Sequence, residues 1–150
     1  MDIDTHYPEG VHLWLVLLKA YAALRAHAEC HIRSLGIGFS DFAVLEVLLH
    51  KGPLPVNTIG SIVRLTSGSI TAAVDRLERK QLVSRCSHIS DGRARVVHLT
   101  AEGRRLIEPA FADHAAAMER VTAGLTPAER REAIGLLKKL GLYAAGLPAG

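Results

Sequence analysis

Hydrophobic residues along most of the chain recur at intervals of three and four positions, the period of an α-helix. The fourth such segment shows this clearly, because Ile70, Val74 and Leu77 fall at i, i+4 and i+7. The first is apolar on nearly all sides, and such a helix is usually buried against a partner chain as well as its own core. The predicted helices cover about residues 11–34, 41–51, 56–63 and 67–80.

Between the first two helices the segment "SLGIGFS" interrupts the pattern with two glycines, and Ser40 with Asp41 is expected to cap the second helix. That helix ends at Gly52-Pro53, and "GPLP" is predicted to be a turn. Only about residues 64–66 then separate the third helix from the fourth. Two helices joined this tightly indicate a helix-turn-helix.

After the fourth helix the period changes to partial alternation in "QLVSRCS" and "RARVVHLT". Asp91-Gly92 between them is a strong signal for a two-residue turn, so a two-stranded antiparallel hairpin is predicted. Thr100 should end the hairpin and cap a fifth helix, which Pro109 should kink or divide.

The last helix carries a complete start signal. Thr126 is the expected cap, Pro127 stands at the first helical position, and Glu129 completes a capping box. This helix should reach about Ala145. The fold class is therefore mainly α with a small two-stranded β wing, a winged helix-turn-helix within residues 35–100.

The fourth helix begins with "SGSIT", which is rich in hydroxyls and lacks bulk. The second helix of a helix-turn-helix lies in the major groove of DNA, where small leading residues permit a close approach. Backbone N–H groups and the helix dipole at this end also favour a phosphate. The expected contacts on this helix and its surroundings are Asn57, Thr58, Thr66, Ser67, Gly68, Ser69, Thr71, Ala72, Arg76, Arg79 and Arg85.

Charge is concentrated around this helix. The chain carries a net charge of +3, yet residues 64–105 hold nine basic and four acidic side chains. This local excess indicates a polyanionic partner, and Arg93 at the hairpin tip is placed to enter an adjacent minor groove. An ordinary helix start would explain "SGS" alone, but the conjunction of these features favours double-stranded DNA.

Composition and motifs narrow the classes of protein to which the chain can belong. Hydrophobic residues make up 49% and charged residues 22%, which is typical of a globular domain. No segment resembles a membrane span or a signal peptide, so a cytoplasmic protein without membrane contact is expected. Motifs of hydrolases, nucleotide-binding loops and metalloenzymes are missing, so neither an enzyme nor a cofactor is predicted.

The segments "SGSITAAVDRLERKQLVSR" and "SDGRARVVHLTAEGRRL", with "GFSDFAVLEVLLHKGPLPVNTIG" before them, resemble the MarR (multiple antibiotic resistance regulator) family. "SDFAVLEVLLHKG" and "TSGSIT" resemble its quinone-responsive, methylhydroquinone-type members most. The resemblance implies a homodimer whose interlocked helices come from residues 1–34 and 101–150, bound to a pseudo-palindromic operator. It also implies that Asp91 pairs with Arg76 to hold the wing. Gln81 departs from the glycine that the family usually has there.

Family members commonly release DNA when a small aromatic or phenolic ligand enters the crevice between the dimer helices and the winged lobe. The resemblance therefore implies a repressor of that kind, although core packing is the better explanation of each aromatic group considered singly. The candidates for an effector site are Trp14, Tyr21, His31, Phe39 and Phe42.

Two other switches are compatible with the sequence. Cys30 is a candidate for oxidation because His27, His31 and Arg33 lie nearby, although a buried inert thiol is the default for both cysteines, Cys30 and Cys86. His27, Cys30 and His31 would supply three metal ligands without an evident fourth, so no metal is assigned. A winged-helix module that binds proteins instead of DNA is the alternative of another class.

Overall fold

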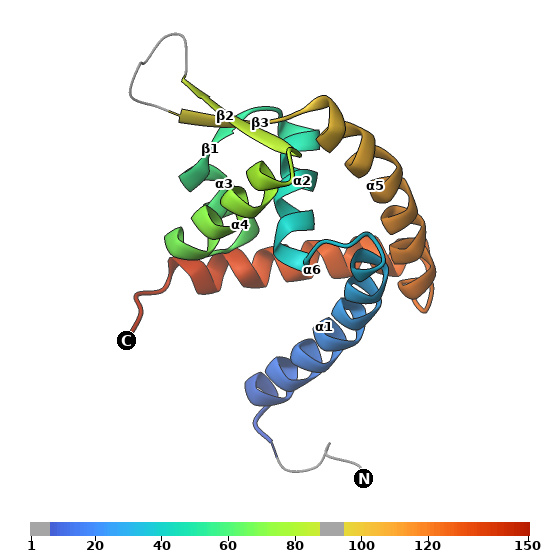
Figure 1. Ribbon diagram of the computed structural model, residues 1–150. Helices are drawn as coiled ribbons and strands as arrows, with labels where there is room; N and C mark the ends of the chain where they lie inside the picture. The colour runs from blue at the N-terminus through green and yellow to red at the C-terminus, as the bar shows by residue number, and fades with distance from the viewer. Residues whose placement is uncertain (1–6, 88–94) are drawn as a thin grey trace.

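The computed structural model describes residues 7–87 and 95–150. Within these ranges the chain forms six helices and three strands. In order they are α1 (Glu9–Arg33), α2 (Phe39–Lys51), β1 (Leu54–Pro55), α3 (Val56–Val63), α4 (Ser67–Arg79), β2 (Val83–Ser87), β3 (Arg95–Leu99), α5 (Ala101–Val121) and α6 (Pro127–Gly146). Helices α2 to α4 and the sheet form one lobe, from which α5 leads away toward α1 and α6 (Figure 1). The predicted winged helix-turn-helix is confirmed.

The sheet has three strands where the sequence predicted two. Its order is β1-β3-β2, and both pairings are antiparallel. The hairpin register places Val83 opposite Leu99, while Leu54 of β1 lies opposite Val97. The segment predicted as a simple turn therefore contributes a short strand on the other side of β3.

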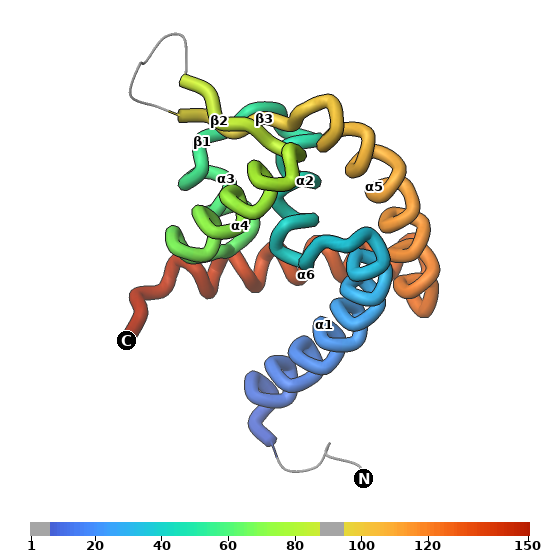
Figure 2. The backbone as a smooth tube through the Cα atoms, in the orientation of Figure 1, coloured from blue at the N-terminus to red at the C-terminus, as the bar shows by residue number. Residues whose placement is uncertain are grey.

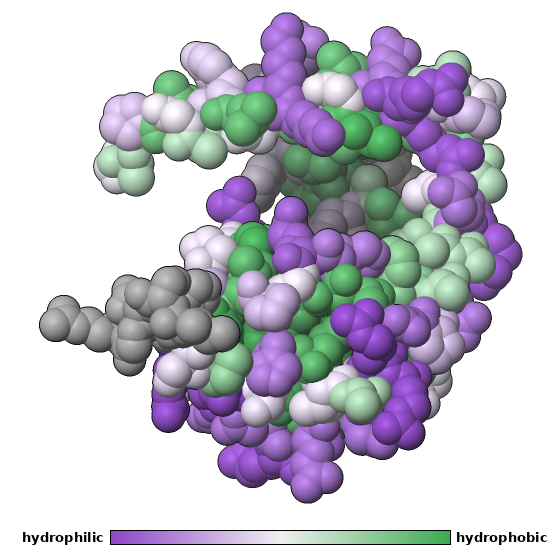
Figure 3. Space-filling model, turned by 90° about the horizontal axis from the view of Figure 1, so that it is seen from above, coloured by the Kyte–Doolittle hydropathy of each residue, from purple (hydrophilic) through white to green (hydrophobic). Residues whose placement is uncertain are grey.

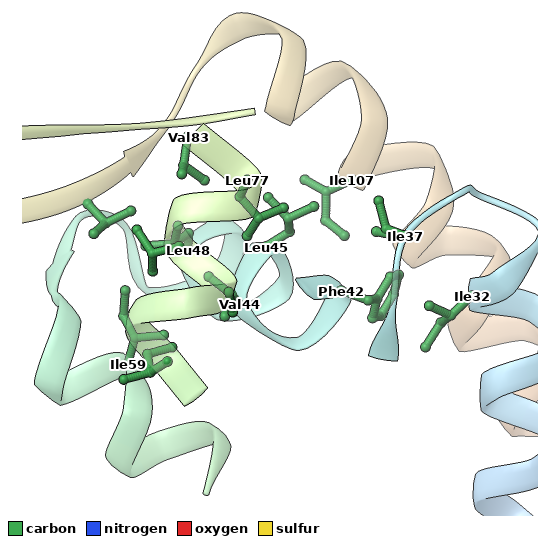
Figure 4. Packing of buried hydrophobic residues seen from close by; sticks show 14 of the residues in the cluster. Ile32, Ile37, Phe42, Val44, Leu45, Leu48, Ile59, Leu77, Val83 and Ile107 are labelled. Carbon is green, nitrogen blue, oxygen red and sulfur yellow. The ribbon is translucent and has the colours of Figure 1, made fainter. Parts of the chain in front are cut away.

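The core of the lobe lies between α2, α4, the sheet and the first half of α5. Leu45, Leu77 and Ile107 are fully buried and converge from three helices (Figure 4). Phe42 and Ile32 continue the same cluster toward α1. This packing holds the inner face of α4 and leaves its other face to solvent.

Helix starts agree with the sequence at two sites. The side chain of Thr100 accepts a hydrogen bond from the Gly103 N–H, and Thr126 with Glu129 forms a capping box. The expected cap at Ser40 and Asp41 is wrong, because α2 already begins at Phe39 and has no side-chain cap. Asp41 lies inside the first turn, where its carboxylate has a distant partner described below.

Pro109 does not divide α5, which runs unbroken from Ala101 to Val121. The helix instead follows a curved path around the lobe (Figure 2). A proline bends a helix because it lacks an N–H and its ring presses on the preceding turn, so curvature without interruption is the milder of the two predicted outcomes.

Helix α6 stands apart from the rest of the chain. None of its residues is buried, and an open gap lined by hydrophobic residues separates it from the winged lobe (Figure 3). Its apolar side chains include Leu142, which is 77% exposed, and Tyr143. Trp14 on α1 is also 62% exposed. Among the described residues, no helix has the length and apolar character needed to cross a membrane.

Candidate nucleic-acid interface

Helix α4 presents a bare surface at its first two turns. Ser67, Gly68, Ser69, Thr71 and Ala72 are all exposed. The buried side chains Ile70, Ala73, Val74 and Leu77 hold the opposite face. The sequence therefore predicted correctly which face of the helix is free, and small side chains cover that face where the helix begins.

The hydroxyl groups at this end also organise the helix itself. Thr66 is the N-cap, and its Oγ1 accepts from the Ser69 N–H over 3.2 Å and donates to Ser69 Oγ over 2.9 Å. Thr71 Oγ1 donates to the Ser67 carbonyl oxygen over 2.8 Å. Three of the four predicted hydroxyl contacts at this helix start, Thr66, Ser69 and Thr71, thus have local hydrogen-bond partners in the free chain.

The helix before it approaches α4 closely. A Cβ atom on Gly60 of α3 would stand 3.1 Å from Ile70 Cγ2, so the absence of a side chain at Gly60 permits this close packing. Arg64 ends α3 in the left-handed conformation, with φ of 61°. Asn57 and Thr58, the predicted contacts on α3, are exposed.

The basic side chains of this region have different surroundings. Arg85 of β2 donates to Asp75 over 2.7 Å and to Glu78 over 3.0 Å, both on α4. Burial lowers the pKa of Arg85, but the two carboxylates raise it by more than burial lowers it. The net shift of the Arg85 pKa is therefore upward. Arg85 thus fixes β2 to α4, whereas sequence reasoning had placed it only against DNA.

Arg76 contacts a carboxylate that sequence reasoning missed. Its Nη2 donates to Asp41 Oδ1 over 2.8 Å, and hydrogen bonds to Asp41 raise the pKa of Arg76. Asp41 precedes Arg76 by 35 positions, so no local pattern reveals the pair. The expected partner Asp91 and the wing-tip residue Arg93 lie outside the described residues.

Three of the predicted effector residues meet at one pocket. It has a volume of about 280 Å³ and lies where α1, α2 and α5 adjoin. Tyr21, Phe39 and Phe42 line it, and His114, which sequence reasoning did not single out, closes it from α5. Arg25 lies over the Phe39 ring, 4.8 Å from its centroid, and Glu46 adds a carboxylate.

The other two candidates lie outside this pocket's lining. His31 lies beside His114, with ring centroids 6.1 Å apart and the ring planes tilted by 34°. Trp14 borders a separate pocket of about 330 Å³ between α1 and α6. The sequence indicated aromatic character correctly, but could not tell which side chains face the same space.

Neither cysteine is buried in the single chain, so the expectation of buried thiols is wrong. Cys86 Sγ lies 3.5 Å from His98 Nδ1 on the neighbouring strand. Cys30 is exposed on α1, and the described part of the chain contains no group of three metal-ligating side chains close enough to hold an ion. In the single chain, His27, Cys30 and His31 do not form such a group.

Comparison with known proteins agrees with this architecture. The model of the MarR family matches residues 35–94. The HTH-type transcriptional regulator MhqR of Bacillus subtilis is 38% identical, over 91% of this chain and 94% of that protein. The HTH-type transcriptional repressor Rv2887 of Mycobacterium tuberculosis is 31% identical, over 86% of this chain and 93% of that protein.

Among solved structures, a mutant MarR from E. coli complexed with operator DNA superposes with a TM-score of 0.79. It is 22% identical and the match covers 88% of this chain and 95% of that one, so it shows the shared fold. The identity to the two regulators extends over almost their whole length, including the helices on both sides of the winged lobe. The chain therefore belongs to the MarR family of transcriptional regulators.

Proposed function

We propose that the chain is a homodimeric repressor that binds a pseudo-palindromic operator and is released by a small aromatic, phenolic or quinone ligand. The observation that carries the DNA-binding part is the exposed start of α4, where residues 67–69, 71 and 72 offer little bulk and the positive end of the helix dipole lies at the surface. Related proteins named as repressors, and one solved with operator DNA, support the same assignment.

The proposed DNA contacts are of three kinds. Ser67, Gly68, Ser69 and Ala72 approach base edges in the major groove, while the exposed Arg79 reaches the phosphate backbone. Arg93 enters the neighbouring minor groove from the wing. Recognition thus combines a closely fitted helix start with charge supplied from its flanks.

The surfaces of α1 and α6 support the proposed dimerisation. Both helices expose large apolar side chains, including Trp14, Leu142 and Tyr143, and the gap beside α6 is lined by hydrophobic residues. Soluble monomers seldom leave contiguous apolar surface of this kind uncovered. A second copy of the chain is the partner that also supplies the second winged lobe needed for a pseudo-palindrome.

The pocket beside α1, α2 and α5 is the proposed effector site. Its aromatic lining suits a planar ring, and Arg25 and Glu46 offer a charged donor and an acceptor to a phenol or quinone oxygen. The pocket adjoins α2, which packs directly on the DNA-reading helix α4. Occupation of the pocket is therefore expected to alter how the two winged lobes of the dimer are presented to DNA.

The test is a titration of labelled duplex from the region upstream of the protein's own gene, followed by fluorescence anisotropy. Tight binding that weakens steeply as salt rises from about 50 to 200 mM, with far weaker binding to a scrambled duplex, is expected. Arg93→Ala should weaken binding strongly while the dimer stays folded. Lack of binding at low salt would instead support the protein-interaction module.

The release step is tested on the same complex. Methylhydroquinone and a phenolic acid are each added to the wild type, to Phe39→Ala and to Cys30→Ser. Release that is lost in Phe39→Ala but kept in Cys30→Ser supports a ligand in the pocket. Release that depends on Cys30 alone would assign the switch to the thiol.

A further inference from the structure

Helix α2 carries a buried carboxylate at its beginning. The Asp41 side chain is only 5% exposed, yet it belongs to the first turn of the helix, two residues after Phe39 of the pocket. A buried carboxylate is costly unless cations or hydrogen-bond donors compensate it. Asp41 therefore depends on the partner that α4 provides.

That partner is Arg76, and the contact is a fork. Arg76 Nη2 donates to Asp41 Oδ1 over 2.8 Å, and Nε lies 3.3 and 3.4 Å from the two carboxylate oxygens. Such a planar arrangement fixes direction as well as distance, which a lysine cannot reproduce. The pair thus constrains the rotation of α4 relative to α2.

A second contact reaches the same region from the end of α4. Lys80 Nζ donates to the Gly36 carbonyl oxygen over 3.1 Å, in the turn that precedes α2. The end of α4 and its C-cap are therefore tied to the first turn of α2 and to the turn before it. The first half of α4 carries the proposed base contacts and packs on α3 through Ile70.

Arg79 makes an instructive contrast on the same helix. Within the described residues its guanidinium has no ion pair or side-chain hydrogen bond, and it is exposed. Arg76 can turn fully toward a phosphate only by leaving Asp41 buried without its cation, which is expensive. The two arginines are three positions apart, but the charge of Arg76 already compensates a buried carboxylate, whereas that of Arg79 compensates none within the described residues.

We propose that Asp41 and Arg76 form a positioning pair that orients the DNA-reading helix, so that Arg76 raises operator affinity through Asp41 and not by binding a phosphate. The proposal rests on the DNA binding proposed above. It adds Asp41, a residue remote from the presented face of α4, to the determinants of affinity. It also predicts that the pair acts as a unit.

The experiment measures operator affinity of the full chain at several salt concentrations for Asp41→Asn, Arg76→Gln, Arg76→Lys and the double variant Asp41→Asn with Arg76→Gln. Each single variant should lose roughly tenfold in affinity, the range expected for a hydrogen-bonded charged pair. The double variant should be no weaker than the worse single one. The slope of log affinity against log salt should stay that of the wild type.

Arg79→Gln is the matched control, because loss of one phosphate contact should reduce the salt slope by about 0.9. Circular dichroism and the thermal midpoint establish that each variant is folded, and Arg76→Lys retains a cation if Arg76→Gln unfolds. A reduced slope in Arg76→Gln, with near wild-type affinity in Asp41→Asn and Arg76→Lys, would overturn the proposal. Failure of the wild type to bind any operator would contradict the proposed function itself.

Discussion

A Cβ atom on Gly103 would stand 1.9 Å from the backbone carbonyl oxygen of Leu82, so the first turn of α5 lies directly against the chain that enters β2. The same carbonyl accepts a hydrogen bond from the Thr100 N–H over 3.1 Å. Neither backbone segment can move without breaking this bond or the cap of α5. Gly103 is thus a position where α5 and the chain entering the sheet are in very close contact.

Gly103→Ala should therefore destabilise the fold by roughly 2 kcal/mol or more, because the added methyl group overlaps backbone that cannot yield. Urea unfolding followed by circular dichroism measures the change. Gly68→Ala is the control, since a Cβ there meets nothing within 4 Å and the residue is helical. The control should keep or slightly raise stability; equal losses in both variants would contradict the close contact at Gly103.

Gln81 has a φ of 61°, the left-handed conformation that glycine adopts without strain. Its carbonyl oxygen accepts from Thr100 Oγ1 over 2.6 Å, so the neighbouring cap holds it in place. Gln81→Gly should raise the free energy of unfolding by about 0.5–1 kcal/mol, as relief of strain exceeds the added chain entropy. Thermal unfolding checks this, with Gln81→Ala as the control that retains the strain and should show little gain.

The sequence predicted features that depend on neighbouring residues. Caps such as Thr100 and Thr126 were predictable because donor and acceptor lie within one turn. Asp41 was misread as a cap because it resembles one locally, while its partner stands 35 positions away. Strand β1 was missed for the same reason, since two residues gain strand geometry only by pairing with β3.

In the candidate site, too, some features were predictable from the local sequence and others were not. The free face of α4 followed from the period of its buried residues, which any amphipathic helix reveals. The pocket did not, because His114 comes from α5 and meets Phe42 at a ring-centroid distance of 5.1 Å only through tertiary packing. The partners of a charged side chain were equally hard to predict. The position of Arg85 in the sequence does not indicate that Asp75 and Glu78 lie beside it.

His114 should make stability depend on pH. Burial lowers its pKa below the ordinary value of 6.5, the Glu46 carboxylate opposes this, and His31 adds to the lowering. A histidine with a lowered pKa in the folded state contributes stability that is present above the unfolded value and is lost as pH falls below it. The thermal midpoint should therefore drop between about pH 7 and pH 5.

Replacement of His114 by phenylalanine removes this titration and should flatten the pH dependence of the thermal midpoint over the same range. The ring fits a site already formed by Phe42, Met118 and other apolar groups, so folding should be preserved. His27→Phe, at an exposed position of α1, is the matched control and should leave the wild-type pH profile unchanged. An unaltered profile in His114→Phe would exclude this histidine as the source.

Leu142→Asp should abolish the proposed homodimer. Leu142 is 77% exposed on α6 in the single chain, and a carboxylate placed in an apolar interface is strongly disfavoured. Sedimentation equilibrium should give the mass of two chains for the wild type and of one for the variant. Thr58→Asp, exposed in the first turn of α3, is the control and should remain dimeric. A wild-type dimer that persists in Leu142→Asp would place the interface away from this part of α6, whereas a monomeric wild type would contradict dimerisation through either helix.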